Sequence, residues 1–444
     1  MIEFDVGTGV PLYTQILSPY PSISDTDEWD GLKYADGNSD CGFSISNCGC
    51  AITSIVMVAR SYRITNTQEL DVNPKEINNW LNSESGGYVN GGVNWIAAAK
   101  YTGWRIKYEK SDKTTNNYVL LDEKLNNNQP VIAKANRGRG GISREHFFVI
   151  DKKLASTYSV KDPAWYNTKI LNEGFNSDIQ HVRNYDNGFD GLRIYKKGDG
   201  IAQKAMTLVL GSPAELLITD SFGNKLGKDQ NGVEYNQISN GWYFEEGFDD
   251  PTGENPPSQH KNKIIQILEP TDGQYDIQII GTGAGNYSLN SDIYDSDGNS
   301  HFQTITGNTQ PNLITDYSLN LTNGKPGEIV IPVSIDIKPG TYPNSINLGS
   351  NGVIPVAIFG SAALDVKNIN IPTIRLGSAS VKLKGNGQSV FNYSDLNTDG
   401  FIDVVVKIST ETFSLSSTDI TTNLEGKLQN GITIRGSDSV RIVP

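Results

Sequence analysis

The sequence is poor in the features that mark membrane-spanning and disulfide-rich proteins. No apolar run approaches the roughly 20 residues that a helix needs to cross a bilayer, so no membrane span is expected. Only three cysteines occur in 444 residues, too few and too clustered for a disulfide scaffold. Basic residues are outnumbered, with 37 lysines and arginines against 50 aspartates and glutamates. The resulting net charge of −13 repels phosphates, so nucleic acid is not an expected partner.

The chain is long enough for two to four domains, and its pattern changes character twice. Residues 1–198 mix helical and strand periodicities, which predicts an α+β domain. Residues 199–324 carry only short apolar runs separated by turn signals, which predicts an all-β sandwich. Residues 325–444 repeat that style and predict a second β-sandwich. Gly-, Lys- or Pro-containing stretches mark both changes.

Cys50 stands directly before a predicted helix. In the segment SNCGCAITSIVMVARSY, the apolar residues Ile52, Ile55, Val56 and Ala59 recur with helical spacing. The thiol would therefore lie at a helix N-terminus, where unpaired amides and the helix dipole favour the nucleophilic thiolate. Taken alone, a cysteine in this position is more often a small buried apolar residue. Cys50 becomes a candidate nucleophile only if a base lies near it.

His146 is the candidate base among four histidines. It opens the strand pattern EHFFVIDKK, and the next strand pattern, STYSVKDP, ends at Asp162. If the two strands form a hairpin that turns around Leu154, His146 lies directly opposite Asp162. Pro163 favours an extended backbone at Asp162, which suits a residue that orients an imidazole through one hydrogen bond. A lone strand histidine is usually structural, but the ordered set predicts a Cys-His-Asp triad.

Residues 1–198 resemble the bacteriocin-processing, double-glycine peptidase-like branch of the papain-like cysteine peptidases. The resemblance rests on Gln15 in PLYTQILSPY, on Gly49-Cys50 at a helix start, on His146 before an apolar strand, and on Asp162 followed by proline. It implies a papain-like fold with Cys50, His146 and Asp162 as the catalytic triad and no cofactor for catalysis. It also implies that Gln15 donates to the oxyanion beside the Cys50 backbone N–H. The alternative for Gln15 is a solvated loop residue.

The sequence departs from this family in one respect. Members fused to export transporters carry membrane spans and an ATPase, whereas this chain has no span and no GxxxxGK[ST] motif. Cleavage after a double glycine in a leader peptide is therefore not implied. Cys41 and Cys48 are expected either to close a short disulfide loop, if the protein is exported, or to remain thiols. A zinc site from the three cysteines is disfavoured, since no histidine has ligand spacing to them.

The segment SDLNTDGFIDVVVK near the C-terminus carries a pattern typical of calcium loops. Its oxygen-bearing residues Asp395, Asn397, Asp399 and Asp403 occupy positions 1, 3, 5 and 9, with Gly400 at position 6 for the sharp turn. A valine stands at position 12 and a strand pattern follows, so the segment is not a full EF-hand. We expect structural Ca²⁺ at these four residues, with a plain Asx-rich turn as the alternative.

The two predicted sandwiches resemble secreted modules. Residues 199–324 are similar to immunoglobulin-like modules of bacterial exoenzymes, and residues 325–444 to a C-terminal β-domain of large secreted bacterial proteins. The chain begins MIEFDVGTGVPLY, without a secretory signal, as a secreted protein does once its signal is removed. The resemblances imply a secreted or cell-surface location and cell-surface or polysaccharide contacts through the β-domains.

These observations predict a secreted cysteine peptidase that hydrolyses peptide bonds of a peptide or protein substrate. Two other functions fit the same sequence. A surface adhesion protein would bind peptide in the same domain without cutting it. An acyl transferase would use the same triad but pass the acyl group to an amine, because an acyl-enzyme can be intercepted by acceptors other than water.

Overall fold

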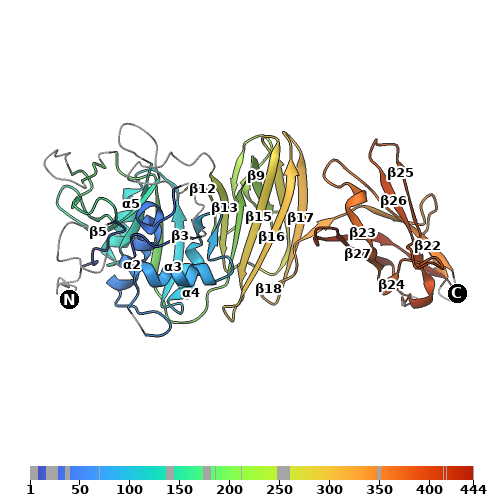
Figure 1. Cartoon of the computed structure of the whole chain (residues 1–444), viewed down its shortest axis with the longest axis horizontal. Coiled ribbons are helices and arrows are strands. Elements are labelled where there is room, and N and C mark those ends of the chain that lie inside the picture. Colours follow the sequence, from blue (N-terminus) through green and yellow to red (C-terminus); the bar gives the residue numbers. More distant parts are fainter. Residues whose placement is uncertain are drawn as a thin grey trace. The chain divides into compact units, whose positions relative to one another are not determined.

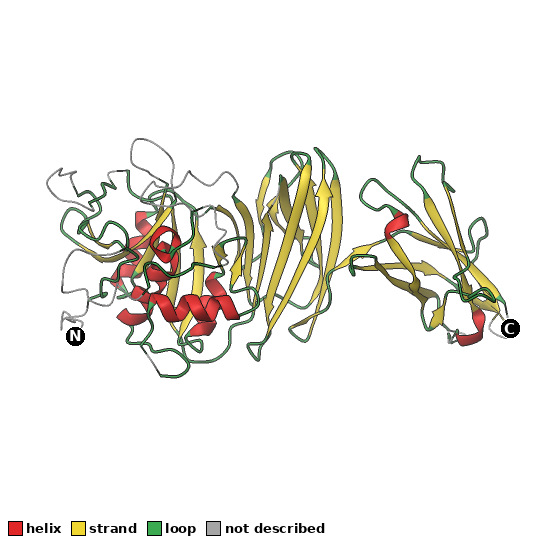
Figure 2. Ribbon diagram, viewed as in Figure 1, coloured by secondary structure: helices red, strands yellow, loops and turns green. Residues whose placement is uncertain are grey.

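The computed structural model describes residues 9–16, 29–35, 41–69, 71–136, 145–173, 182–185, 187–211, 213–247, 261–347, 352–413, 415–416 and 418–443. Strands make up 46% of the chain and helices 12%, so the predicted β-rich architecture with several sheets is confirmed (Figure 2). The chain forms two compact units. The first comprises Met1–Ser212, Glu234–Thr271 and Asn286–Gly307, and the second comprises Pro213–Val233, Asp272–Gly285 and Asn308–Pro444.

The α-helices of the described residues lie in the first unit (Figure 1). They are α1 (Ile45–Cys48), α2 (Cys50–Ser61), α3 (Pro74–Ser83), α4 (Trp95–Tyr101) and α5 (Tyr118–Asn126). Asparagine side chains cap three of them, because Asn73, Asn94 and Asn117 accept backbone N–H groups of the first turns of α3, α4 and α5. The helix predicted from the apolar spacing after Cys50 is confirmed as α2. None of the helices of the described residues is long and apolar enough to cross a membrane.

A five-stranded antiparallel sheet lies among these helices. Its order is β3-β7-β4-β5-β6, with β3 (Ile106–Asp112), β4 (Val131–Ala135), β5 (His146–Lys153), β6 (Tyr158–Lys161) and β7 (Gly191–Lys197). Side chains of β5 alternate between two buried clusters, as the strand period requires. Phe147 and Val149 belong to the cluster that contains α2 and α4, whereas Phe148 and Ile150 belong to the cluster that contains α5. Helices therefore cover both faces of this sheet.

The hairpin of β5 and β6 forms as predicted, but in a different register. The prediction set His146 directly opposite Asp162, whereas the observed ladder ends with Val149 opposite Lys161. The departure begins at the turn, where Lys153 pairs with Tyr158, and the register shifts once more between Ile150 and Lys152. Asp162 therefore follows the end of β6 instead of pairing in the ladder, and the predicted register was wrong.

A second five-stranded sheet belongs to the first unit. Its order is β12-β13-β8-β15-β16, with β8 (Ala205–Gly211), β12 (Gly241–Glu246), β13 (Asn262–Leu268), β15 (Gly285–Tyr294) and β16 (Ser300–Thr309). The short hairpin of β1 (Tyr88–Val89) and β2 (Gly92–Val93) packs on it, since Val89 shares a buried cluster with Val209, Phe244 and Ile264. The strand β11 (Glu234–Asn236) also lies in this unit.

The described residues of the second unit form strands and the short 3₁₀ helices η3 (Val366–Asn368) and η4 (Thr410–Thr412). Its largest sheet runs β10-β9-β14-β17-β19-β28-β27-β23-β24, and a second runs β20-β22-β26-β25. The bounds are β9 (Ala214–Thr219), β10 (Lys225–Lys228), β14 (Gly273–Gly281), β17 (Ile314–Thr322), β18 (Lys325–Pro326), β19 (Val330–Pro332), β20 (Ile335–Ile337), β21 (Ser345–Asn347), β22 (Val353–Ile358), β23 (Ile369–Leu376), β24 (Ala379–Ser380), β25 (Phe391–Ser394), β26 (Asp403–Ser409), β27 (Thr421–Leu428), β28 (Thr433–Ser439) and β29 (Arg441–Val443). These sheets are consistent with β-sandwiches, and the three predicted domain ranges stay a prediction.

Candidate functional site

His146 and Asp162 meet in the interior of the first unit. His146 is the first residue of β5, and its Nε2 lies 2.8 Å from Asp162 Oδ1. Both side chains are 0% exposed. The other ring nitrogen, Nδ1, is buried and makes no hydrogen bond. The ring is therefore held by one carboxylate at Nε2, and Nδ1 remains for a second partner.

Asp162 is surrounded by donors in addition to His146. The backbone N–H groups of Ala164 and Trp165 donate to Oδ1 at 2.9 and 2.8 Å. The phenol of Tyr185 donates to Oδ2 at 2.5 Å. Tyr185 is itself held in place by stacking on Phe148, with ring centroids 4.2 Å apart. A buried carboxylate with this many donors keeps its charge and one orientation.

The electrostatics of the pair follow from this burial. Burial lowers the pKa of His146 below its ordinary value, and the nearby Asp162 opposes that shift only in part. Burial alone would raise the pKa of Asp162, but the hydrogen bonds from His146, Tyr185 and the Trp165 backbone hold that pKa below its usual range. Burial also raises the pKa of Tyr185, so the phenol keeps the proton that it donates. The pair is thus an ionised carboxylate beside a neutral imidazole at neutral pH.

Cys50 begins α2, and α2 packs against β5, the strand that His146 opens. The cysteine is not disulfide-bonded and is 2% exposed. No hydrogen bond joins its sulfur to His146 Nδ1. Gly49 before it has no room for a side chain, since a Cβ there would lie 2.5 Å from Ile45 Cγ2 and 2.6 Å from the Ile45 carbonyl oxygen. The tight turn between α1 and α2 thus requires glycine directly before Cys50.

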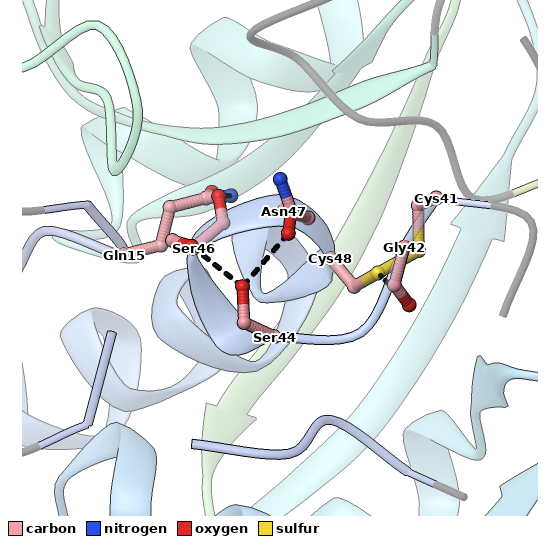
Figure 3. Close-up of a disulfide and its surroundings, with 7 residues drawn as sticks. All are labelled: Gln15, Cys41, Gly42, Ser44, Ser46, Asn47 and Cys48. Carbon is pink, nitrogen blue, oxygen red and sulfur yellow. Dashed lines mark hydrogen bonds between the residues drawn. A yellow bond between two sulfur atoms is a disulfide. The ribbon is translucent and has the colours of Figure 1, made fainter. Parts of the chain in front are cut away.

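Gln15 connects the segments that carry Cys50 and Asp162. Its backbone N–H donates to the Pro163 carbonyl at 2.9 Å, and its side-chain Nε2 donates to the Ser46 carbonyl at 2.8 Å. Figure 3 shows the Gln15 side chain beside Ser46 in the short helix α1. The residue is 0% exposed, so the alternative of a solvated loop glutamine does not hold. Its Oε1 is buried without a hydrogen-bond partner.

Cys41 and Cys48 form a disulfide, so of the two expectations for this pair the structure has the closed loop (Figure 3). Their Cα atoms are 5.5 Å apart, and Cys48 is the last residue of α1. The bridge and Gln15 therefore hold the same short helix, α1, which directly precedes Cys50. Two of the three cysteine sulfurs are thereby withdrawn from metal binding.

The predicted calcium loop lies between β25 and β26 and is closed by its own hydrogen bonds. Asp403 is 0% exposed, and its two oxygens accept the backbone N–H groups of Gly360 at 2.9 Å and Leu396 at 2.8 Å. Asp395 Oδ2 accepts the Gly400 N–H at 3.0 Å, while its Oδ1 is buried with no hydrogen-bond partner. Across the described residues, which include this loop, no three acidic, cysteine or histidine side chains gather as metal ligands. The hydrogen bonds are those of an Asx-rich turn, and calcium binding stays a prediction.

Two residues around His146 were not predicted from the sequence as part of the site. Tyr185 donates to Asp162 from 23 positions further along the chain, and no local pattern marks it. Glu145, which directly precedes His146, is 2% exposed and was treated only as the first residue of a strand pattern. A charged residue directly before a candidate catalytic histidine and the apolar run 147–150 was the signal that could have drawn attention to it.

Comparison with protein-family models and with curated proteins identifies no relative. No protein-family model matches the chain, and no curated protein matches it. The resemblance to bacteriocin-processing peptidases stays a prediction. A proposal for the function therefore has to rest on the geometry around His146.

Proposed function

We propose that this protein is a cysteine peptidase that hydrolyses peptide bonds through Cys50, His146 and Asp162. One observation carries the proposal: a buried imidazole is held at Nε2 by a fully hydrogen-bonded carboxylate, while Nδ1 is left without a partner. A histidine that served only packing would be expected to satisfy both nitrogens. The helix that begins with Cys50 packs on the strand that begins with His146, which supports Cys50 as the partner of Nδ1.

The chemistry follows from these roles. Nδ1 of neutral His146 takes the thiol proton as Cys50 Sγ forms a bond to the scissile carbonyl carbon. The imidazolium, stabilised by Asp162, returns that proton to the leaving amine nitrogen as the C–N bond breaks. Water then attacks the acyl-enzyme, loses a proton to His146 and releases the acid together with the thiol. Asp162 keeps its charge throughout and holds the ring.

Gln15 is proposed to stabilise the oxyanion together with the Cys50 backbone N–H. Its amide nitrogen has two N–H groups, and the Ser46 carbonyl accepts one, so one is left for an oxyanion. Loss of one such donor typically raises the barrier by about 2.7–4 kcal/mol. Anchoring by Ser46 and Pro163 supports this role, because a fixed donor needs no reorganisation during the reaction.

The proposal also covers fold and location. The α+β arrangement of helix-borne Cys50 and strand-borne His146 supports a papain-like domain. The Cys41–Cys48 disulfide supports a secreted or cell-surface location, since disulfides persist mainly in oxidising compartments. The acidic surface favours a neutral or basic peptide substrate.

The test is digestion of a peptide library by the full-length chain and by its Cys50→Ala variant, with products identified by mass. We expect the variant to lose hydrolysis and to lose labelling of that site by iodoacetamide, while its melting temperature stays close to that of the wild type. A Ser54→Ala variant, with its hydroxyl in the same helix, is the matched control. Hydrolysis that survives in Cys50→Ala would contradict the proposal.

A second candidate is a peptide-binding protein that does not cut. The specific observation in its favour is the burial of the site, with Cys50 2% and His146 0% exposed. This candidate predicts no cleavage of any library peptide and slow alkylation of Cys50, together with saturable peptide binding by calorimetry.

A further inference from the structure

Glu145 is a buried charged residue outside the proposed triad, and it directly precedes His146. Its carboxylate is 1% exposed. One oxygen accepts from Lys261 Nζ at 2.7 Å and lies 3.4 Å from Lys134 Nζ, and the other accepts the Gly247 backbone N–H at 2.8 Å. Burial of a carboxylate is unfavourable unless donors surround it. These donors therefore determine where Glu145 lies.

Two of these donors come from residues that flank strands of the second sheet of the first unit. Gly247 directly follows β12, and Lys261 directly precedes β13. Both belong to the range 199–324, which the sequence predicted as an accessory module. The support of Glu145 thus comes from a segment more than 100 positions away from it in the sequence.

A buried ion pair fixes the end of β12. Glu246, its last residue, is 0% exposed and bonds to Arg193 at 2.6 Å. Its other oxygen accepts from Trp95 Nε1 at 3.0 Å. Arg193 lies on β7, opposite Ile132 of the neighbouring strand β4. The contacts therefore run without a gap from Arg193 to Glu246, through Gly247 to Glu145, and so to the first residue of β5.

We propose that Glu145 is a positioning residue for His146, and that the second sheet, through Gly247 and Lys261, is part of the catalytic apparatus. This rests on the proposed peptidase function. Asp162 sets the orientation of the imidazole ring, whereas Glu145 sets the position of the backbone from which the ring projects. Catalysis is sensitive to both, because a displacement of about 1 Å can reduce the rate about 100-fold.

The experiment compares single variants of the full-length chain on a peptide that the wild type cleaves. Lys261→Met removes one donor at a half-exposed position, and we expect kcat to fall with KM unchanged. Lys261→Arg keeps the donor and should restore kcat. Lys263→Met, two residues further along in β13, is the matched control and should behave as the wild type. Glu145→Gln should give the larger loss, about 100-fold in kcat.

The outcomes separate the two proposals. A Lys261→Met variant with a lowered melting temperature but wild-type kcat would show a purely structural contact and overturn the positioning role. If Glu145→Gln does not fold, Lys261→Met and its Arg counterpart decide alone. The same assay on Cys50→Ala tests the triad separately, because that substitution leaves every contact of Glu145 in place. If Cys50→Ala still hydrolyses the peptide, both proposals fail.

Discussion

Two aspartate-containing segments were predicted as functional, and they differ in what their oxygens bind. Asp162 accepts from a histidine, a tyrosine and two backbone amides, all inside the first unit. Asp403, which is equally buried, accepts only from backbone amides, those of Gly360 and Leu396. A carboxylate that accepts from side chains holds those chemical groups in place. A carboxylate that accepts only from backbone amides fixes the backbone, here at Leu396 in the loop and at Gly360, 43 positions away in the sequence.

The difference between the two segments lies in their hydrogen-bond donors, which a sequence motif does not specify. Both segments matched a pattern of residue types and spacings, but a pattern does not reveal which donors reach each oxygen. At Asp162 the donors leave a neighbouring ring nitrogen without a partner, as a catalytic base requires. At the loop between β25 and β26, Asp395 Oδ1 is a buried oxygen without a hydrogen-bond partner, whereas calcium takes six to eight oxygen ligands.

The largest effect is expected from Asp162→Asn. An amide in this position favours the wrong histidine tautomer, and the analogous change in a serine-protease triad lowers kcat about 10⁴-fold. We expect a loss of this order in peptide hydrolysis. Asp316→Asn, an exposed aspartate on β17, is the control and should keep full activity. Wild-type turnover by Asp162→Asn would contradict a catalytic role for Asp162 and leave it, like Asp403, a structural carboxylate.

An intermediate effect is expected on stability at acid pH. Burial lowers the pKa of His146, whereas the unfolded chain has the ordinary value near 6.5. Below that value the unfolded state binds a proton that the folded state does not yet bind. The free energy of unfolding therefore decreases as the pH decreases, by at most about 1.4 kcal/mol per pH unit. Urea unfolding at pH 7.5, 6.5 and 5.5 should show this slope in the wild type and in His301→Gln, whose imidazole is 40% exposed, but less of it in His146→Gln. Equal slopes in all three proteins would refute the assignment to His146.

The smallest effect is expected from calcium removal. Free calcium at ten times its Kd would stabilise the folded state by about 1.4 kcal/mol, so chelation should lower the melting temperature by roughly 3 °C. Asp395→Asn should abolish this response. Asp403→Asn should destabilise the protein with or without chelator, since it disturbs backbone hydrogen bonds. A wild-type melting temperature that does not change with chelator would contradict calcium binding and favour the Asx-rich turn.

The sequence predicted individual helices and strands well, but it predicted the contacts between them less well. Helical spacing after Cys50 predicted α2, and the strand patterns around His146 and Asp162 predicted their contact. The hairpin register was wrong because the residue types do not show where the turn closes. Lys153 pairs with Tyr158, so the turn spans residues 154–157 instead of centring on Leu154. Hydrogen-bond donors distant in sequence were not predictable at all. Tyr185 is 23 positions from Asp162 and Lys261 is 116 positions from Glu145, and only the folded chain brings each pair together.

The position of the disulfide has a consequence for how the chain must fold. Three cysteines within ten residues allow three pairings, and only the Cys41–Cys48 bridge leaves the thiol of Cys50 reduced. Because Cys50 is buried at the first residue of α2, docking of that helix hides its sulfur from oxidants and leaves the other two to combine. The order of helix docking and oxidation during biogenesis therefore determines which molecules keep the reduced Cys50 thiol that the proposed peptidase requires.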